Sequence, residues 1–203
     1  FAVVPSGGFR ESGPEGAALQ DRMLAVARAA GMRIVGPNCL GLANIHNNVY
    51  AAFGSITRPP QLRRGPVSLV TQSGGFGYSI ALACAQEGIG FRNVIATGNE
   101  ADVDMVEFIE AVLDDEETQI ILAYMEGLKN GRALLDAGRR ALALGKPLLV
   151  WKGGVTEQGA RAAATHTANM TGSYEIWKAL FRQAGIVEIR ELHEPAASVT
   201  AFQ

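Results

Sequence analysis

His166 and Glu126 are the side chains in this sequence best suited to covalent chemistry. His166 lies in a run of alanine, threonine and asparagine, with no bulky neighbour to shield its imidazole ring. A neutral imidazole can act as a nucleophile and form a covalent intermediate. Glu126 follows an apolar run and could accept a hydrogen bond from one ring nitrogen, which frees the other to attack. We predict a catalytic pair, with a helix-capping or solvated carboxylate as the alternative for Glu126.

The stretch from Pro66 to Gly88 could hold an anion. Its β-branched run at 67–70 predicts a buried strand, and apolar residues at helical spacing after Gly75 predict a helix. Ser73, Gly74 and Gly75 lie at the junction, where backbone N–H groups at the positive end of the helix dipole would bind phosphate. A plain strand-to-helix turn with Ser73 as the N-cap residue is an equally good interpretation of these residues alone.

Strands and helices alternate from residue 65 onward. Strands are expected at 67–70, 93–96, 119–124, 147–151 and 186–189, and helices at 75–87, 102–113, 132–144, in segments of 156–183 and from about 194. This alternation predicts an α/β fold with a flavodoxin-like, doubly wound parallel sheet. Ligands of such sheets bind beyond the carboxyl ends of the strands, where Ser73 and Glu126 are both expected.

The beginning of the chain predicts a separate β–α–β unit. A strand at 1–5, a helix at 14–30 and a strand at 33–36 follow one another. Two parallel strands need neighbours and helices on both faces. We therefore expect 1–46 to be the C-terminal fragment of a larger Rossmann-like domain, 47–64 to be a linker, and 65–203 to be the flavodoxin-like domain.

Composition and charge exclude several classes of partner. The formal net charge of −2 over 203 residues gives no electrostatic reason to expect nucleic acid or an anionic membrane surface. No apolar run approaches the roughly 18 residues that span a bilayer, and no signal peptide is visible. Cys39 and Cys84 form no disulfide framework, which favours a reducing compartment. We predict a cytoplasmic protein with no metal site of its own.

Seven short motifs are more specific together than any one of them alone. They are, in order, Ser6-Gly7-Gly8-Phe9-Arg10-Glu11, Gly36-Pro37-Asn38-Cys39-Leu40-Gly41, Thr71-Gln72-Ser73-Gly74-Gly75, Thr97-Gly98-Asn99, Tyr124-Met125-Glu126-Gly127, Trp151-Lys152-Gly153-Gly154 and Thr165-His166-Thr167. This ordered set resembles the α portion of NDP-forming acyl-CoA synthetases, the ADP-forming acetyl-CoA synthetase relatives of succinyl-CoA synthetase. The resemblance covers essentially the whole chain.

The resemblance implies roles for residues along the chain. It implies a CoA-binding Rossmann-like domain, ending near Asn44, followed by a flavodoxin-like ligase domain. Phosphate would bind at Ser73–Gly75, His166 would be the phosphorylated histidine, and Glu126 would steady it. Pro37, Asn38 and Cys39 would lie near the thiol end of CoA, with a buried thiol in a turn as the alternative for Cys39.

The resemblance also implies a reaction and a partner. Acyl-CoA, NDP and phosphate would interconvert with acid, CoA and NTP through an acyl phosphate and a phosphohistidine. Nucleotide and Mg²⁺ would be bound by an ATP-grasp domain or subunit, not by this chain, and the enzyme would be an oligomer. The family tends to read Ser-His-Thr-Gly where this chain has Thr165-His166-Thr167-Ala168, which could restrict the loop.

Two other functional classes remain open from the sequence. One is a non-catalytic, CoA-sensing synthetase-like module of a protein lysine acyltransferase, against which the presence of His166 and Glu126 argues. The other is a plain flavodoxin-like module for a nucleotide or a flavin, which the few aromatic residues near the strand ends disfavour. The sequence does not identify the acyl group, the nucleotide base or a fused partner.

Overall fold

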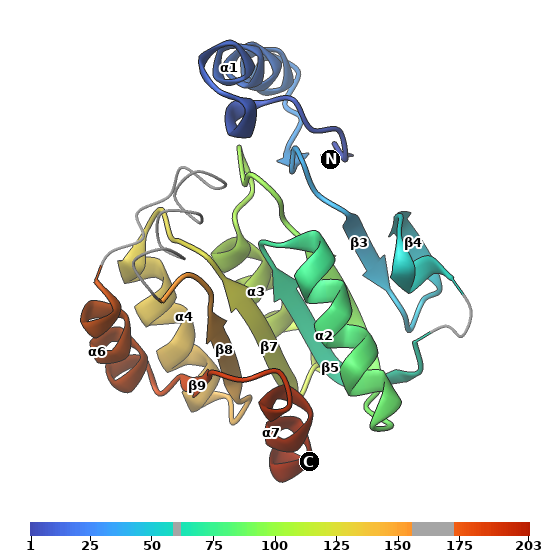
Figure 1. Cartoon of the computed structure of the whole chain (residues 1–203), viewed down its shortest axis with the longest axis vertical. Helices are drawn as coiled ribbons and strands as arrows, with labels where there is room; N and C mark the ends of the chain where they lie inside the picture. The colour runs from blue at the N-terminus through green and yellow to red at the C-terminus, as the bar shows by residue number, and fades with distance from the viewer. Residues whose placement is uncertain (59–61, 156–172) are drawn as a thin grey trace.

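The computed structural model describes residues 1–58, 62–155 and 173–203 of the chain. A large sheet with helices on both faces forms most of it, and a small N-terminal unit lies beyond one end of that sheet (Figure 1). His166 and the helical segments predicted within 156–172 lie outside the described residues.

The large sheet has seven strands and is mostly parallel. In spatial order they are β4 (Val49–Ala52), β3 (Gly41–Asn44), β6 (Phe91–Ala96), β5 (Arg64–Thr71), β7 (Ile120–Met125), β8 (Leu148–Lys152) and β9 (Val187–Ile189). The strands from β6 to β9 run parallel, and their order relative to the chain is 2-1-3-4-5, as in flavodoxin. The predicted α/β class and flavodoxin-like sheet are confirmed.

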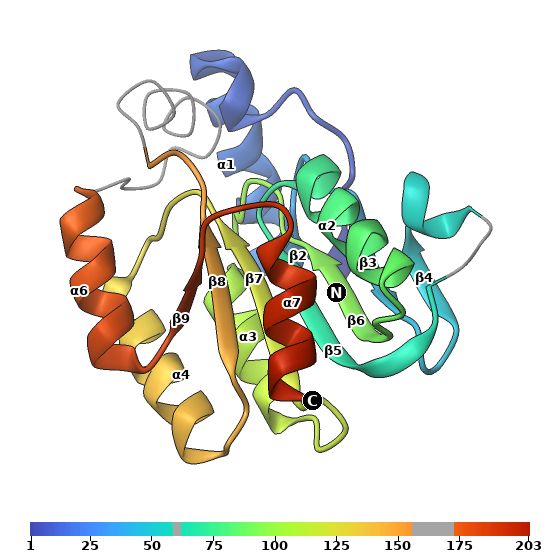
Figure 2. The same ribbon diagram turned by 60° about the horizontal axis from the view of Figure 1, so that its bottom comes forward.

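Helices cover the two faces of this sheet (Figures 1 and 2). The helices α2 (Gly74–Gln86) and α7 (Glu194–Phe202) pack on one face, and α3 (Met105–Asp114), α4 (Gly131–Ala143) and α6 (Tyr174–Ala184) pack on the other. Successive strand residues point to opposite faces, so Leu69 of β5 packs under α2 while Val70 packs under α3. Burial of these apolar side chains holds the three layers together.

The N-terminal unit has the predicted β–α–β order. It consists of β1 (Ala2–Val3), a short 3-10 helix η1 (Arg10–Ser12), α1 (Pro14–Ala29) and β2 (Ile34–Val35), with β1 and β2 parallel. The loop between β6 and α3 runs beside it and makes backbone hydrogen bonds, such as Asn99 N–H to Pro37 O at 2.9 Å. Arg33 adds ion pairs to Asp102 and Glu107, at 2.9 Å each.

The segment 47–64, predicted to be a linker, includes a strand. Residues 49–52 form β4, which pairs antiparallel with β3, and β3 pairs antiparallel with β6 of the large sheet. Hydrophobic periodicity did not predict these strands, because β4 is an edge strand whose residues alternate only between exposed and half-buried positions. The division of the chain into domains stays a prediction, but residues 41–52 extend the sheet of the second one.

The elements predicted after residue 65 lie close to the observed ones wherever the structure describes them. The helix expected from 102 begins at Met105, because the Asp104 side chain accepts hydrogen bonds from the N–H groups of Val106 and Glu107. Glu107 completes a capping box with the Asp104 backbone. Local capping, rather than hydrophobic periodicity, sets this boundary.

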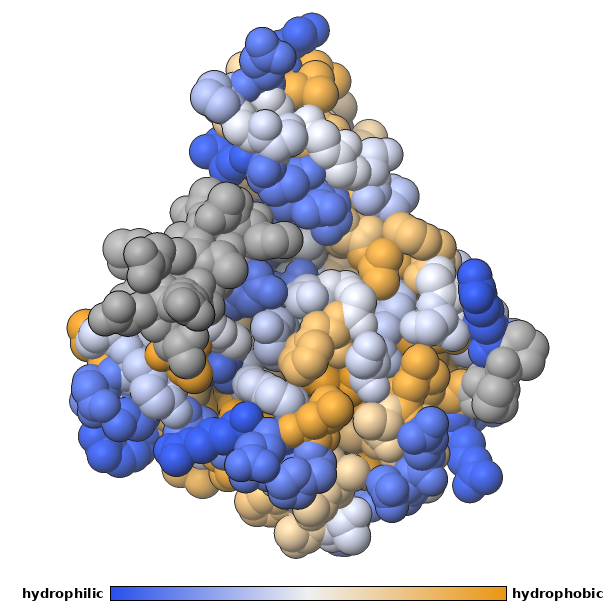
Figure 3. Space-filling model, in the orientation of Figure 1, coloured by the Kyte–Doolittle hydropathy of each residue, from blue (hydrophilic) through white to orange (hydrophobic). Residues whose placement is uncertain are grey.

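Among the described residues, none of the helices combines the length and the apolar character needed to cross a bilayer. The face of the molecule in Figure 3 mixes small hydrophilic and hydrophobic groups, with hydrophilic residues over much of α1.

Candidate functional site

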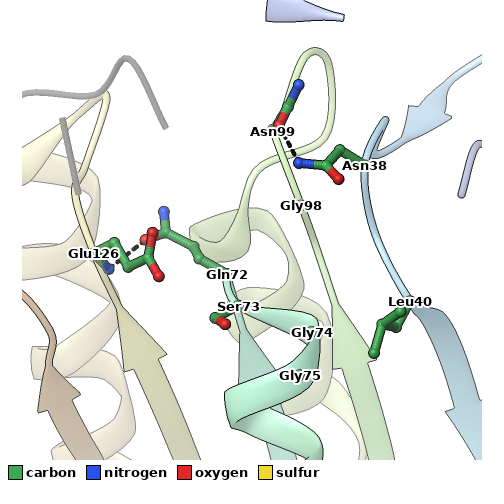
Figure 4. Close-up of a pocket in the computed structure, with 9 residues that line it drawn as sticks. All are labelled: Asn38, Leu40, Gln72, Ser73, Gly74, Gly75, Gly98, Asn99 and Glu126. Atoms are coloured by element: carbon green, nitrogen blue, oxygen red, sulfur yellow. Dashed lines mark hydrogen bonds between the residues drawn. The ribbon is translucent and has the colours of Figure 1, made fainter. Parts of the chain in front are cut away.

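A pocket of about 240 Å³ opens at the carboxyl end of β5, where the chain changes direction between neighbouring strands. Its lining residues come from the segments that follow β2, β5, β6 and β7, and they are Asn38, Leu40, Gln72, Ser73, Gly74, Gly75, Gly98, Asn99 and Glu126 (Figure 4). The predicted site residues Ser73, Gly74, Gly75, Glu126 and Asn38 thus lie around one cavity.

The floor of this pocket is the start of α2. Ser73 caps the helix, and its Oγ accepts a hydrogen bond from the Phe76 N–H at 3.4 Å. Gly74 and Gly75 are the first helical residues, whose N–H groups have no acceptor within the helix. A side chain at Gly74 would lie 2.4 Å from Leu40 Cγ, whereas one at Gly75 would meet open space. The amides at this end of α2 therefore belong to residues that line the pocket, where the positive end of the helix dipole favours an anion.

Gln72 joins this floor to the turn after β7. Its side chain is 4% exposed, and its Oε1 accepts hydrogen bonds from the N–H groups of Glu126 at 2.5 Å and Gly127 at 3.0 Å. Its Nε2 donates to Gly127 O at 2.8 Å and to Glu100 Oε2 at 3.0 Å. Figure 4 shows the Gln72 amide beside Glu126, whose carboxylate extends toward the pocket.

Glu100 is the buried acid behind Gln72. It is 1% exposed, and its Oε1 accepts from Thr97 Oγ1 at 2.9 Å and from the Met105 N–H at 3.0 Å. Burial raises the pKa of Glu100 to about 7, although the hydrogen bonds from Thr97 and Gln72 oppose that rise. Neither Gln72 nor Glu100 was among the predicted site residues, since polar residues beside glycine turns usually face solvent.

Lys152 is the buried base next to Glu126. A lysine at a strand end is usually solvated, yet Lys152 is only 4% exposed. Its Nζ donates to Glu126 O at 2.9 Å and to Gly153 O, and lies 4.9 Å from the centre of the Trp177 ring. Burial lowers the pKa of Lys152 to about 8, and the charge of Glu126 opposes that fall. Lys152 therefore places a cation beside the Glu126 turn.

The segment 37–39 is divided between the pocket and the interior. Asn38 lines the pocket, and its Nδ2 donates to Asn99 Oδ1 at 3.2 Å. Cys39 is 2% exposed, its Sγ donates to Val4 O at 3.6 Å, and burial raises the pKa of its thiol. Cys39 is not among the lining residues and has the surroundings of an inert, structural thiol.

The pairing of Glu126 with His166 stays a prediction, because His166 lies outside the described residues. Within the ranges that the structure does describe, no three His, Cys, Asp or Glu side chains gather in a way that would hold a metal ion. The described part of the pocket is therefore lined by helix amides, the three amide side chains of Asn38, Gln72 and Asn99, and a carboxylate.

Comparisons with known proteins support the fold and identify the family. A family model described as the succinyl-CoA ligase like flavodoxin domain matches residues 64–202. The chain is 38% identical to acetate–CoA ligase [ADP-forming] I of Archaeoglobus fulgidus over 95% of its own length and 27% of that protein. It is 36% identical to the alpha subunit of acetate–CoA ligase [ADP-forming] II of Pyrococcus furiosus, over 98% of this chain and 42% of the subunit.

A solved structure is similar over nearly the whole chain. It is the dinucleotide forming acetyl-coenzyme A synthetase 1 of Ca. Korarchaeum cryptofilum, in complex with phosphate and ADP, with a TM-score of 0.89 and 34% sequence identity. The match covers 99% of this chain and 42% of that one, so the chain spans less than half the length of these relatives. From its sequence motifs, its sheet and these matches, the chain belongs to the family of proteins with a succinyl-CoA ligase like flavodoxin domain.

Proposed function

We propose that this chain is part of an NDP-forming acyl-CoA synthetase and supplies its phosphate-binding and phosphoryl-carrying residues. The observation that carries the proposal is the convergence of the open α2 amides and the Glu126 turn on one pocket. The likeness to ADP-forming acetate–CoA ligases over nearly the whole chain supports the same reaction class. The enzyme would interconvert acyl-CoA, NDP and phosphate with acid, CoA and NTP.

The α2 amides bind inorganic phosphate and orient it. A phosphate oxygen attacks the thioester carbonyl, the C–S bond breaks, and CoA leaves as its thiol after taking a proton. The products are an acyl phosphate and CoA. The positive end of α2 stabilises the phosphate charge throughout, which is electrostatic preorganisation rather than covalent help.

His166 then receives the phosphoryl group. Its ring nitrogen attacks phosphorus, the bond to the acyl oxygen breaks, and the carboxylic acid leaves as its anion. Glu126 accepts a hydrogen bond from the other ring nitrogen and stabilises the cationic ring. An oxygen of the nucleoside diphosphate finally attacks the phosphohistidine, which regenerates the imidazole and gives the triphosphate.

CoA and the nucleotide are substrates that this chain would share with other parts of the enzyme. Asn38 and Asn99, polar and linked to each other at the pocket rim, fit the amide-bearing thiol arm of CoA. An ATP-grasp domain or subunit would hold the nucleotide with Mg²⁺. We also propose that the enzyme is cytoplasmic and oligomeric.

Labelling with a nucleoside triphosphate tests the function. The full enzyme that carries this chain, incubated with γ-labelled triphosphate, should give an acid-labile, base-stable phosphoprotein, as a phosphohistidine does. His166→Ala should remove the label, while His193→Ala, which changes an exposed histidine, should keep it. Label that persists in His166→Ala would assign the carrier role to another residue, and an unlabelled wild-type enzyme would favour a non-catalytic CoA-binding module.

A further inference from the structure

We propose that Gln72 is a positioning residue for the proposed phosphoryl transfer: its buried amide, oriented by Glu100, fixes the Glu126–Gly127 turn relative to the phosphate-binding amides. This inference rests on the proposed function and adds to it the residues that set the geometry of the site. The observations behind it are the contacts of one side chain and the place where strands β5 and β7 separate.

Strands β5 and β7 pair in register up to Thr71 and Tyr124. The Gln72 N–H still reaches Tyr124 O at 3.1 Å, and β5 then turns away into α2. Beyond that point the Gln72 side chain continues the pairing, because its amide bonds both the N–H and the C=O of Gly127. A side-chain amide therefore does the work of the next strand residue and holds the turn that carries Glu126.

The hydrogen bonds of this amide use its full capacity. A glutamine side chain offers two N–H donors and one oxygen with two lone pairs. Gln72 donates to Gly127 O and Glu100, and it accepts from Glu126 and Gly127. Since every site is used and the side chain is 4% exposed, the amide cannot rotate without breaking buried hydrogen bonds.

Glu100 favours the same orientation of the Gln72 amide as the two N–H groups that bind its oxygen. An ionised carboxylate only accepts hydrogen bonds, so it selects the Nε2 end of the amide. Glu100 is held in turn by Thr97 Oγ1, by the Met105 N–H at the start of α3, and by Lys129 Nζ on its backbone oxygen. The charged groups that act on its carboxylate are Asp104 and Lys129. The orientation of Gln72 is thus set from α3 and from the segment before α4.

The adjacency of Gln72 to Ser73 gives this network a role at the site. Ser73 caps the helix whose amides would bind phosphate, and Gln72, the preceding residue, holds the turn of the proposed catalytic acid. A buried hydrogen-bond network far from the site would stabilise the fold without positioning the reacting groups. Ser68 offers the comparison, since it lies in β5, the strand that precedes Gln72, is fully buried and bonds Thr118 Oγ1 at 2.8 Å and Asn93 Nδ2 at 3.0 Å.

The test is Gln72→Glu in the full enzyme, measured as the rate of phosphoprotein formation from labelled nucleoside triphosphate. The new carboxylate keeps its acceptor for the two N–H groups but faces Gly127 O and Glu100 without a donor. At alkaline pH, where both carboxyls are ionised, the rate should fall about tenfold or more relative to wild type, because small misplacements of reacting groups are costly. The second carboxyl raises the apparent pKa of the pair above that of Glu100 in the wild type, and at lower pH a proton shared by the two carboxyls should restore much of the loss.

The double variant Gln72→Glu with Glu100→Gln supplies the rescue. It places the Nε2 donor of residue 100 opposite the new carboxylate, so the rate above neutral pH should exceed that of Gln72→Glu alone. Glu100→Gln alone should slow the reaction, since the Nε2 donors of residues 72 and 100 then face each other. If Gln72→Glu does not fold, this variant tests the positioning role in its place. KM for phosphate should stay within about threefold of wild type, because the α2 amides are untouched.

Ser68→Ala is the matched control and should lower the melting temperature without slowing phosphorylation. Equal rates in wild type and Gln72→Glu, no recovery in the double variant, or an equal loss in Ser68→Ala would each overturn the positioning role. An unlabelled wild-type enzyme would instead overturn the proposed function, so the two failures are distinguishable.

Discussion

The tetrapeptide Ser-Gly-Gly-Phe occurs twice in this chain, at 6–9 and at 73–76, and the two copies have different environments. At 73–76 it begins α2, and its first helical amides are open to the pocket. At 6–9 it precedes η1, and the carboxylate of Glu11 accepts the N–H groups of Gly8 at 2.7 Å and Phe9 at 3.2 Å. The first copy is thus closed by an internal anion, and the second is left open for a ligand.

The difference is that an acid of the chain itself occupies the amides of the first turn, whereas the second turn is the one proposed to bind an external anion. Glu11 also accepts a hydrogen bond from Asn99, which lines the pocket. The amides of the first turn therefore bind Glu11, and Glu11 in turn joins the N-terminal unit to the rim of the large sheet. Glu11 lies two positions after the first tetrapeptide. The residue two positions after the second tetrapeptide is Tyr78, which carries no carboxylate.

Closing the second turn as the first is closed should have the largest effect. Gly75→Asp places a carboxylate beside the open amides, where there is room for it and where the helix dipole favours it. Phosphate-dependent turnover of the full enzyme should fall by about 10²- to 10³-fold, the usual cost of losing an anion-stabilising donor. Thermal stability should hold. Gly75→Asn has the same shape without the charge, and an equal loss in both variants would contradict the electrostatic reason.

The two acids beside Asn99 should respond to pH in opposite directions, and Glu100 should give the larger change. Its pKa is raised from 4.5 to about 7 in the folded protein, so the folded state binds more protons between these values. The stability that Glu100 contributes should therefore be fully present below about pH 4.5 and be lost as pH rises through 7, by a few kcal/mol at most. Urea unfolding across this range should show the slope in wild type and lose it in Glu100→Gln. A flat wild-type profile would mean that Glu100 ionises at no cost.

Glu11 should give a smaller effect of the other sign. Partial burial would raise the pKa of Glu11, but hydrogen bonds from Asn99 and the turn amides outweigh it and lower the pKa below 4.5. The stability that Glu11 contributes is present above that ordinary value and is lost as pH falls through the lowered one. Glu11→Gln should cost about 1 kcal/mol at neutral pH, measured by urea unfolding. A cost that persists unchanged in strong acid would exclude the ionised carboxylate as its source.

Alanine substitutions in the two turns should distinguish the effect of side-chain room from the effect of the backbone angle φ. We expect them to have the smallest effects among these predictions. A side-chain carbon at Gly75 or at Gly8 would meet no atom within 4 Å, but Gly8 has a φ of +94°. Gly75→Ala should stabilise the protein by about 0.5 to 1 kcal/mol, because it restricts the unfolded chain. Gly8→Ala should destabilise it, because L side chains disfavour that angle. Equal changes in melting temperature would show that both turns relax freely.

The fold was predictable because its signals are local. Apolar runs such as 67–70 and 120–125 and the glycines that follow them identify buried strands and their turns without knowledge of their neighbours. The parallel order then follows from the alternation with helices. The strands β3 and β4 were not predicted, because each has only four residues and β4, at the sheet edge, alternates only between exposed and half-buried positions.

The site was predictable only where its residues act through the backbone turn that contains them. Ser73, Gly74 and Gly75 carry their own signal, and they do line the pocket. Gln72 acts through residues 28 and 55 positions away in the chain, Glu100 and Gly127, and nothing near Gln72 in the sequence indicates them. The burial of Lys152 has no local signal either, since its Nζ lies over the ring of Trp177, which is distant in the sequence. The roles of Glu126 and His166 stay predictions.

Adjacent residues of the β6–α3 loop face different parts of the molecule. Asn99 bonds Glu11, Gln20 and Asn38 of the N-terminal unit, while Glu100, with a φ of +54°, turns inward to Gln72. A single peptide bond thus connects the residue that contacts the N-terminal unit to the residue that contacts Gln72. Because both residues are held by hydrogen bonds, we expect a shift of the N-terminal unit to be transmitted to the turn that carries Glu126. Slower or faster amide exchange at Gly127 after Asn99→Ala would report that transmission.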